Sequence, residues 1–381
     1  MDKRNIAIIF SITLIAVMGV ASITPALPQI IERFGITPTQ VALLITVFTL
    51  PGIFLSPAIG VFADKWGRKK ILFPSLLLFG IAGGACFFTQ DWHVLLLLRF
   101  FQGIGGAALG SLNLTLIGDL FSGERRTAVM GYNASVLSIG TAVYPGIGGA
   151  LAMAGWQFPF LLTLLAIPTA FVLLMCLNNP EPTKQVTFSQ YIRRVWAYIN
   201  QRTVWALFII NILLFIILYG SYLTYFPQLL KERFDALPWH IGVVMSSFSV
   251  VTAITSTQLA RIQRKLRTIQ IFKLGFVLYG LSMLTIPMSS QWWHLAFPLV
   301  CFGLAHGMLI PSIPNVLVTF APISERAGFM SINGMILRIG QTVGPVFIGL
   351  FYLMGGINYV FIGGAIVALC MFLIAVYMIK L

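Results

Sequence analysis

The sequence predicts an all-α polytopic membrane protein with twelve transmembrane helices in two parallel six-helix pseudo-repeats. Three observations predict it: the composition, twelve long apolar runs, and an internal repeat. Of 381 residues, 58% are hydrophobic and only 9% are charged, against roughly 25% charged in soluble domains. A soluble chain of this length has too little interior to bury so much apolar side chain. The composition therefore excludes a soluble enzyme, a secreted disulfide scaffold and a disordered protein.

The apolar runs divide the chain into two halves. A transmembrane helix needs about 20 mostly apolar residues. The runs lie near 5–31, 39–62, 71–89, 94–118, 127–153, 157–177, 204–230, 239–260, 269–289, 294–319, 327–353 and 358–379. The one long connection falls after the sixth run, so we expect an N-terminal half at 1–177, a cytoplasmic linker at 178–203 and a C-terminal half at 204–381.

The linker contains apolar residues at helical spacing. They are Phe188, Tyr191, Ile192, Val195, Trp196 and Ile199, and Arg193 and Arg194 lie off that stripe. The pattern is typical of a short amphipathic helix on the cytoplasmic membrane face. A passive tether between the halves is the alternative.

The net charge of +14 reports topology rather than nucleic-acid binding. Nineteen of the 24 Lys and Arg residues lie in alternate loops, and the opposite loops hold only Arg33, Lys231 and Arg233. By the positive-inside rule the first set is cytoplasmic, with both termini inside. The first apolar run is too long for a cleaved signal peptide. We therefore expect a multi-pass protein of the cell (inner) membrane.

The two halves resemble each other at an offset close to 200. The block Pro28–Phe34 recurs at 227–234 with one inserted residue, Lys231. Further matches follow at an offset of 200: Phe48, Trp92, Gly103, Arg126, Met130, Asn133, Gly140, Pro145 and Gly149 recur at 248, 292, 303, 326, 330, 333, 340, 345 and 349. Six helices is an even number, so the repeats are parallel. Transporters of this build bind substrate near the midplane, between the halves.

The connection between the second and third runs carries a loop signature. Residues 60–70 read GVFADKWGRKK, and this resembles the motif G-x-x-x-D-x-x-G-R-[KR]-[KR] of the major facilitator superfamily. The resemblance spans the whole chain and best fits its twelve-span drug:proton antiporter branch. It implies the major facilitator fold and transport by alternating access.

The same loop is expected to form a conformational latch. By the resemblance, Asp64 and Arg68 stabilise one of the two access states, with Gly60 and Gly67 allowing close helix packing. An arginine can hold a second carboxylate bidentately, and Asp119 is the natural candidate. The alternative is that these charges only fix topology.

The fourth run contains an arginine within an R-x-x-Q-G sequence. Residues 99–103 read RFFQG, which resembles the second motif of proton-coupled members of the superfamily. A membrane-embedded arginine is costly unless it faces a wet or paired interior. Arg99 is therefore expected either to act in substrate binding or proton coupling, or to tie helices together.

The fifth run resembles the antiporter motif G-x-x-x-G-P-x-x-G-G, which marks exporters. Gly140, Pro145, Gly148 and Gly149 match it, and Tyr144 stands where a second glycine is expected. The resemblance implies export, with the tightest helix contact loosened at Tyr144. The alternative is that the Gly and Pro residues only bend the helix.

The polar side chains near the midplane are basic or neutral. Arg338 and His306 each lie twelve residues from a helix end. Further candidates for the substrate or proton pathway are Asn113, Asn211, Tyr219 and Tyr222. Since no Asp or Glu lies deep in a run, we expect an anionic, zwitterionic or neutral substrate. His306 is the candidate proton carrier, although a hydrogen-bonded structural histidine is the alternative.

The sequence predicts a transporter, not an enzyme. The four cysteines are far apart and show no metal spacing, and we see no catalytic set, nucleotide-binding loop or cofactor motif. We therefore expect a secondary active transporter that functions as a monomer in the lipid bilayer and exports small organic molecules against protons. The alternatives are an importer or facilitator of a small anionic metabolite, or a lipid flippase.

Overall fold

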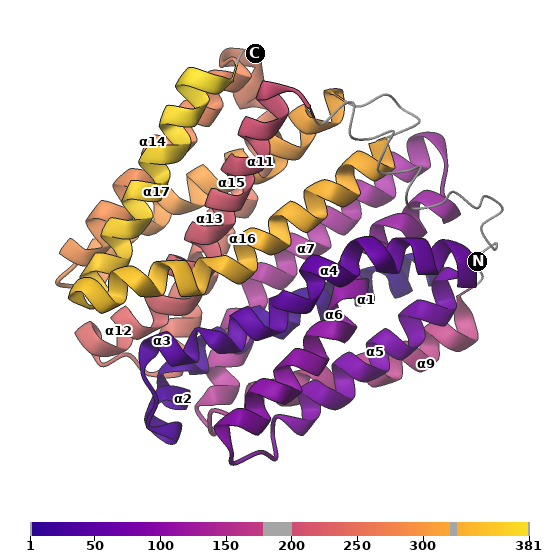
Figure 1. The fold of residues 1–381 in the computed structure, drawn as a ribbon, viewed down its shortest axis with the longest axis horizontal. Coiled ribbons are helices and arrows are strands. Elements are labelled where there is room, and N and C mark those ends of the chain that lie inside the picture. The colour runs from indigo at the N-terminus through magenta and orange to yellow at the C-terminus, as the bar shows by residue number, and fades with distance from the viewer. Residues whose placement is uncertain (1, 178–199, 321–325, 380–381) are drawn as a thin grey trace.

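The computed structural model describes residues 2–177, 200–320 and 326–379, and over these residues it contains helices and turns but no strand (Figure 1). The residues of the predicted amphipathic helix, 188–199, lie outside the described residues.

The first half forms six helical rods, three of them broken into shorter helices. They are α1 (Asp2–Ala21) with η1 (Thr24–Ala26) and α2 (Leu27–Phe34); α3 (Pro38–Val41) with α4 (Leu43–Trp66); α5 (Arg68–Ala85); α6 (Trp92–Leu120); α7 (Gly123–Ala152); and α8 (Phe158–Leu161) with η2 (Leu162–Leu165) and α9 (Ala166–Cys176).

The second half repeats this order. Its rods are α11 (Arg202–Ile216) with the π-helix η3 (Ile217–Tyr225) and α12 (Phe226–Phe234); α13 (Pro238–Lys265); α14 (Thr268–Thr285) with η4 (Ile286–Met288); η5 (Trp292–Leu295) with α15 (Ala296–Thr319); α16 (Arg326–Gly355); and α17 (Ile357–Met378).

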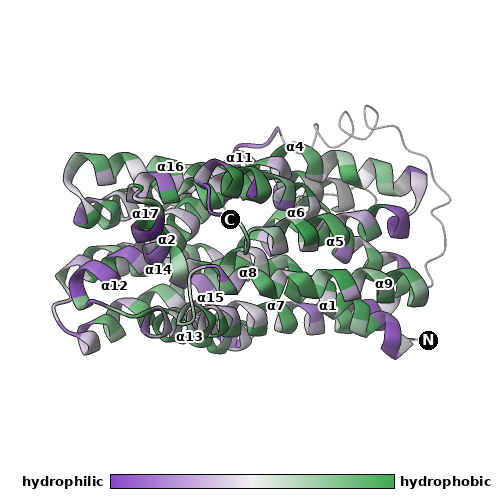
Figure 2. Cartoon of the chain, turned by 90° about the horizontal axis from the view of Figure 1, so that it is seen from below, coloured by the Kyte–Doolittle hydropathy of each residue, from purple (hydrophilic) through white to green (hydrophobic). Residues whose placement is uncertain are grey.

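Eleven helical segments of the described chain are long and apolar enough to cross a membrane. The remaining rod, α5, has 18 residues, and its first turn holds Arg68, Lys69 and Lys70, which lower its hydropathy. It packs along α6 and α9. Figure 2 shows hydrophobic residues along most of the helices and a hydrophilic group at the N-terminus. The predicted all-helical membrane fold is confirmed, and the two sets of six rods agree with the predicted twelve spans.

The rods meet at tight turns whose residues suit them. Gly35 ends α2 at a φ of 61°, a conformation that costs glycine little. The Thr37 hydroxyl accepts a hydrogen bond from the Gln40 amide at 3.2 Å, and Gln40 Oε1 accepts one from the Thr37 amide at 2.8 Å, which is a capping box. Asp91 caps α6 by accepting from the Val94 amide at 2.9 Å.

Each half has its own buried core. One cluster of buried side chains comes from residues 8–177, and the other comes from 204–379 with Ala42 added. The halves meet along two seams, α4 against α16 and α7 against α13, and Figure 1 shows α4 and α16 crossing the middle of the molecule. We call the end with the turns near Gly35 and Asp235 the Arg33 end, and the opposite end the Arg68 end.

Candidate functional site

Hydroxyl groups close the seam between α4 and α16 on its Arg33 side. The Thr46 hydroxyl donates to the backbone carbonyl of Thr342 at 3.1 Å, and the Thr342 hydroxyl donates to the Thr49 hydroxyl at 2.9 Å. Thr49 and Thr342 are buried. These bonds join the two halves directly.

The seam between α7 and α13 is closed in the same way. The Ser249 hydroxyl donates to the carbonyl of Thr141 at 3.1 Å, and the backbone N–H of Gly146 donates to the Ser246 hydroxyl at 3.1 Å. Sequence reasoning missed these hydroxyls. The signal was the repeat, because Ser246 and Ser249 stand 200 residues after Thr46 and Thr49.

Glycines of the antiporter-like motif bring backbones together at this seam. A Cβ at Gly149 would overlap the carbonyl oxygen of Pro238 on α13, and one at Gly148 would overlap that of Ser22 at the end of α1. Gly149 therefore serves the contact between halves, whereas Gly148 serves packing within the first half. Pro145, inside α7, comes equally close to Gly242.

Tyr144 lies beside the motif without blocking this approach. It is half-buried and packs against the core of the first half. A Cβ at Gly140 would lie 3.2 Å from Leu14 and 3.3 Å from the Tyr144 ring. The close backbone contact is one to two turns further along, at Gly148 and Gly149.

Arg338 reaches across the α4–α16 seam, one helical turn from the threonine contacts. A Cβ at Gly52 of α4 would lie 3.1 Å from its Cδ and Nε, and one at Gly110 of α6 would lie 3.8 Å from its Nη2. Its Nη1 donates to Gln341 Oε1 at 3.1 Å. The Tyr219 phenol is within electrostatic reach. Elements of both halves therefore converge on this guanidinium.

The π-helix η3 sends its two predicted site tyrosines in different directions. Tyr219 packs against the core of the first half and so lies at the seam. Tyr222 is buried within the second half, where its hydroxyl donates to the carbonyl of Met245 at 3.1 Å and its ring stacks on Phe302 at 4.8 Å. The Thr224 hydroxyl donates to the carbonyl of Tyr219, five residues earlier, at 2.6 Å, a spacing that fits the wider turn of a π-helix.

Arg99 is fully buried inside the first half. Its Nη1 donates to the carbonyl of Gly19 at 3.0 Å and to Gln102 Oε1 at 2.5 Å, and its Nε donates to the carbonyl of Leu44 at 3.3 Å. The Phe48 ring centroid lies 4.2 Å from its guanidinium carbon. These contacts tie α6 to α1 and α4 and place Arg99 away from the seam.

His306 lies among aromatic side chains of the second half. Its Nδ1 is 2.6 Å from the Tyr279 hydroxyl. Its ring centroid is 6.1 Å from that of Phe302, in a stacked arrangement, and 5.5 Å from that of Phe248. The imidazole is therefore directed toward α13 and α14.

The predicted asparagines brace the two halves separately. The Asn113 amide donates to the Thr13 hydroxyl at 2.5 Å, and that hydroxyl lies 2.5 Å from Asn133 Oδ1. In the second half, the Asn211 amide donates to Asn333 Oδ1 at 2.7 Å. Asn133 and Asn333 are repeat equivalents, so the same helix pair is joined in both halves.

An ion pair joins the start of α5 to the end of α6. Arg68 Nε lies 3.0 Å from Asp119 Oδ2, and the Arg68 side chain is only 6% exposed. Gly67 has a φ of 97°, which favours glycine, whereas a Cβ at Gly60 would meet nothing within 4 Å. The side chain of Asp64 lies outside the described part of the chain.

A second ion pair joins the halves at the Arg33 end. Lys231 Nζ lies 3.8 Å from Glu32 Oε1 and 2.8 Å from Asp235 Oδ1. The hydrogen bond from Lys231 lowers the pKa of the Asp235 carboxyl. Gln29 and Gln228 are equivalent positions of the repeat. Glu32 follows Gln29 by three positions, and Lys231 follows Gln228 by three positions. The residue inserted in the second half thus stands opposite the acidic residue of the first.

Comparisons with known proteins agree on the family. The sequence profile of the Major Facilitator Superfamily matches residues 9–238 and 236–381. The chain is 27% identical over 363 residues to the bacillibactin exporter of Bacillus subtilis (strain 168), covering 90% of this chain and 88% of that protein. It is 23% identical over 358 residues to the quinolone resistance protein NorA of Staphylococcus aureus (strain COL), covering 92% and 90%.

The fold has close counterparts among solved structures. A mutant of the nucleoside transporter NupG superposes with a TM-score of 0.82 at 12% identity, covering 98% of this chain and 100% of the other. At that identity the likeness shows the fold alone. The family match and the relatives make this chain a multi-pass membrane protein and a secondary transporter of small molecules rather than an enzyme. The chain belongs to the Major Facilitator Superfamily, and the relatives named above are a bacillibactin exporter and a quinolone resistance protein.

Proposed function

We propose that the protein exports small organic molecules from the cytoplasm in exchange for protons, by alternating access between its two halves. The observation that carries this proposal is the closure of both seams on their Arg33 side, with Arg338 on the Arg68 side of that closure. The relative named as a bacillibactin exporter supports the direction of transport.

The closure is of a kind that a transport cycle can break and remake. It consists of hydroxyl hydrogen bonds and glycine contacts, and a neutral hydrogen bond contributes about 0.5–1.5 kcal/mol net. Each half keeps its own buried core. The halves can therefore part at the Arg33 end without unfolding.

Proton coupling requires a group that changes its protonation during the cycle. Within the described membrane spans no Asp or Glu lies near the midplane, and His306 is the histidine at that depth. We therefore retain His306 as the proton carrier, with Tyr279 as its hydrogen-bond partner. The latch pair Arg68 and Asp119 is assigned to the stability of one access state.

The test is proton flux in proteoliposomes that enclose a pH indicator. Candidate organic substrates are added in turn under an imposed pH gradient. We expect at least one compound to move protons in the opposite direction, and His306→Asn to abolish this flux while substrate exchange without a gradient persists. If the substrate equilibrates across the membrane at the same rate with and without the pH gradient, the protein is a facilitator. Uptake driven in the same direction as the protons would make it an importer.

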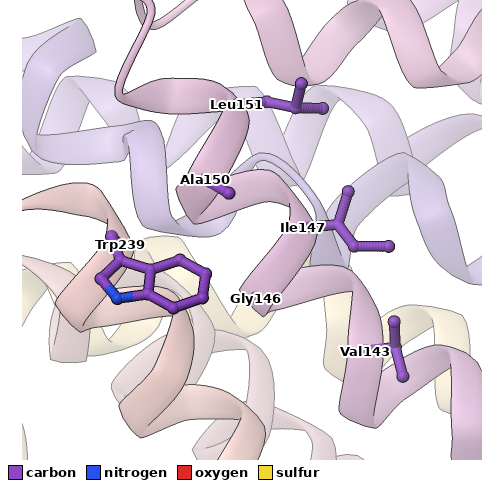
Figure 3. A pocket seen from close by; sticks show the side chains of 6 residues that line it. All are labelled: Val143, Gly146, Ile147, Ala150, Leu151 and Trp239. Carbon is purple, nitrogen blue, oxygen red and sulfur yellow. The ribbon is translucent and has the colours of Figure 1, made fainter.

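A flippase is the second candidate, because an open apolar hollow lies on the surface of α7 beside Trp239 of α13 (Figure 3). The hollow has a volume of about 490 Å³ and is lined by Val143, Gly146, Ile147, Ala150, Leu151 and Trp239. A lipid tail fits such a lining. Transport of a fluorescent lipid between leaflets, with no flux of water-soluble compounds, would favour this candidate over the exporter.

A further inference from the structure

No carboxylate of the described residues neutralises the charge of Arg338. Its described hydrogen bond goes to the neutral Gln341. An unpaired charge within a membrane span is costly, and such residues mark ion or substrate pathways. Arg99 has no carboxylate partner among the described residues either, and its Nη2 makes no hydrogen bond, but two carbonyls, an amide and an aromatic ring hold the rest of its guanidinium inside the first half.

One glycine makes room for this side chain. At Gly52 a Cβ would come within 3.1 Å of Arg338 Cδ and Nε, whereas a Cβ at Gly110 would lie 3.8 Å from Nη2, at ordinary van der Waals distance. The repeat equivalent of Arg338 in the first half is Ser138, so the first half supplies no guanidinium at the matching position. The site is therefore asymmetric, as a site for an asymmetric molecule must be.

Arg338 is also the charged group next to the closed seam. Along α16 it precedes Thr342 by four residues, which is about one turn, and on α4 its neighbour Gly52 follows Thr49 by three. A molecule that moves between the halves from the Arg68 end would meet Arg338 just before the threonine contacts. The side chain is partly exposed, so such a molecule can reach it.

Resting on the proposed function, we propose that the substrate is a small organic anion bearing a carboxylate, which Arg338 binds while the apolar body lies against Tyr219. Arginine presents N–H groups in a planar fork that matches a carboxylate bidentately. Gln341 fixes Nη1, which leaves Nε and Nη2 as donors toward the seam. Tyr219, at the same seam and within electrostatic reach of Arg338, supplies an aromatic face and a hydroxyl.

The experiment measures binding of matched probes to the full-length protein in lipid nanodiscs. The probes are 1-naphthoate, the cation 1-naphthylmethylammonium and inorganic phosphate, and the readout is calorimetry with thermal shift. We expect naphthoate to bind and the cation not to bind. We expect Arg338→Gln to weaken naphthoate at least about tenfold, in line with the loss of a charge-assisted hydrogen-bond pair, and Arg338→Lys to weaken it less.

The control variant is Arg202→Gln, which removes the same charge at the Arg68 end, where Arg202 donates to the carbonyl of Tyr377 at 3.1 Å. It should bind naphthoate like the wild type. The inference is overturned if naphthoate does not bind, or if the cation binds with the same affinity as naphthoate. It is also overturned if Arg338→Gln binds naphthoate like the wild type, or if phosphate displaces naphthoate at equal concentration. If protons drive the flux of cations but not of anions, the protein is an exporter and the inference about its substrate is wrong. If naphthoate binds through Arg338 but no compound shows proton-driven flux, the anion site is supported and the exporter function is wrong.

Discussion

Replacing Gly149 by alanine tests whether the glycine contact between α7 and α13 holds the Arg33 end closed. The new Cβ would overlap the carbonyl oxygen of Pro238 and would lie 3.1 Å from its carbonyl carbon and 3.2 Å from the Cα of Gly242. Carbon atoms rest about 3.5–4.0 Å apart, so the two helices must separate by about 0.5–1 Å. Pro238 and Gly242 belong to the other half, so the cost falls on the state in which this end is closed.

The size of the effect follows from the cost of overpacking. Inserting a methyl group into a well-packed contact costs about 1–3 kcal/mol. A cost of that size shifts the ratio of open to closed Arg33 ends by about 5–150-fold. The core of each half is untouched, so the variant should fold like the wild type.

The assay is double electron–electron resonance between spin labels at Gln90 and Ser290, both exposed at the Arg33 end, with the four native cysteines replaced by serine. We expect Gly149→Ala to add a population at longer distance. The matched control is Gly131→Ala on the same helix, where a Cβ meets nothing within 4 Å. Identical distance distributions for the two variants would refute the reasoning.

Three further predictions concern the ion pairs and the asparagine brace. Asp119→Asn should lower stability by about 1–2 kcal/mol, less than the roughly 3–5 kcal/mol of a fully buried pair, because Asp119 is 30% exposed while its partner Arg68 is buried; thermal unfolding in detergent measures this. Glu32→Lys should place a like charge opposite Lys231 and so lengthen the distances between spin labels at the Arg33 end. Combining it with Lys231→Glu should restore the wild-type distances, and both effects should be smaller in high salt. Asn133→Ala should cost about 1–3 kcal/mol, because its two buried partners lose an acceptor, as chemical unfolding will measure.

Each of these has an outcome that contradicts it. An unchanged melting temperature in Asp119→Asn would mean that the pair does not stabilise the fold. A double exchange that behaves like the single Glu32→Lys would show that the two charges do not act on each other. Equal stability of Asn133→Ala and the wild type would mean that the hydrogen bonds of the brace have no net value.

The fold was predictable because hydropathy and the repeat act over long stretches of chain. The latch ion pair could be anticipated from the loop that holds Arg68, since the motif fixes its position. Side-chain direction could not, because a membrane helix is apolar on every face and its sequence shows no stripe. Tyr219 and Tyr222 are three residues apart, yet a π-helical turn puts one at the seam and the other in a core.

His306 and Arg338 show the same limit. Each lies at midplane depth in the sequence, but only packing decides that the imidazole points toward α14 and the guanidinium toward the other half. The seam hydroxyls escaped notice because Thr and Ser are common in membrane helices. Their recurrence at the repeat offset distinguishes them.

The residue inserted at Lys231 has a consequence for how the two halves recognise each other. Two copies of the first half packed about a two-fold axis would bring Glu32 against its own equivalent, and like charges repel. Lys231 replaces that repulsion with attraction, so the surfaces favour pairing of unlike halves over pairing of like ones. Expressed as two separate polypeptides, residues 1–177 and 204–381 should therefore assemble with each other in preference to forming homodimers.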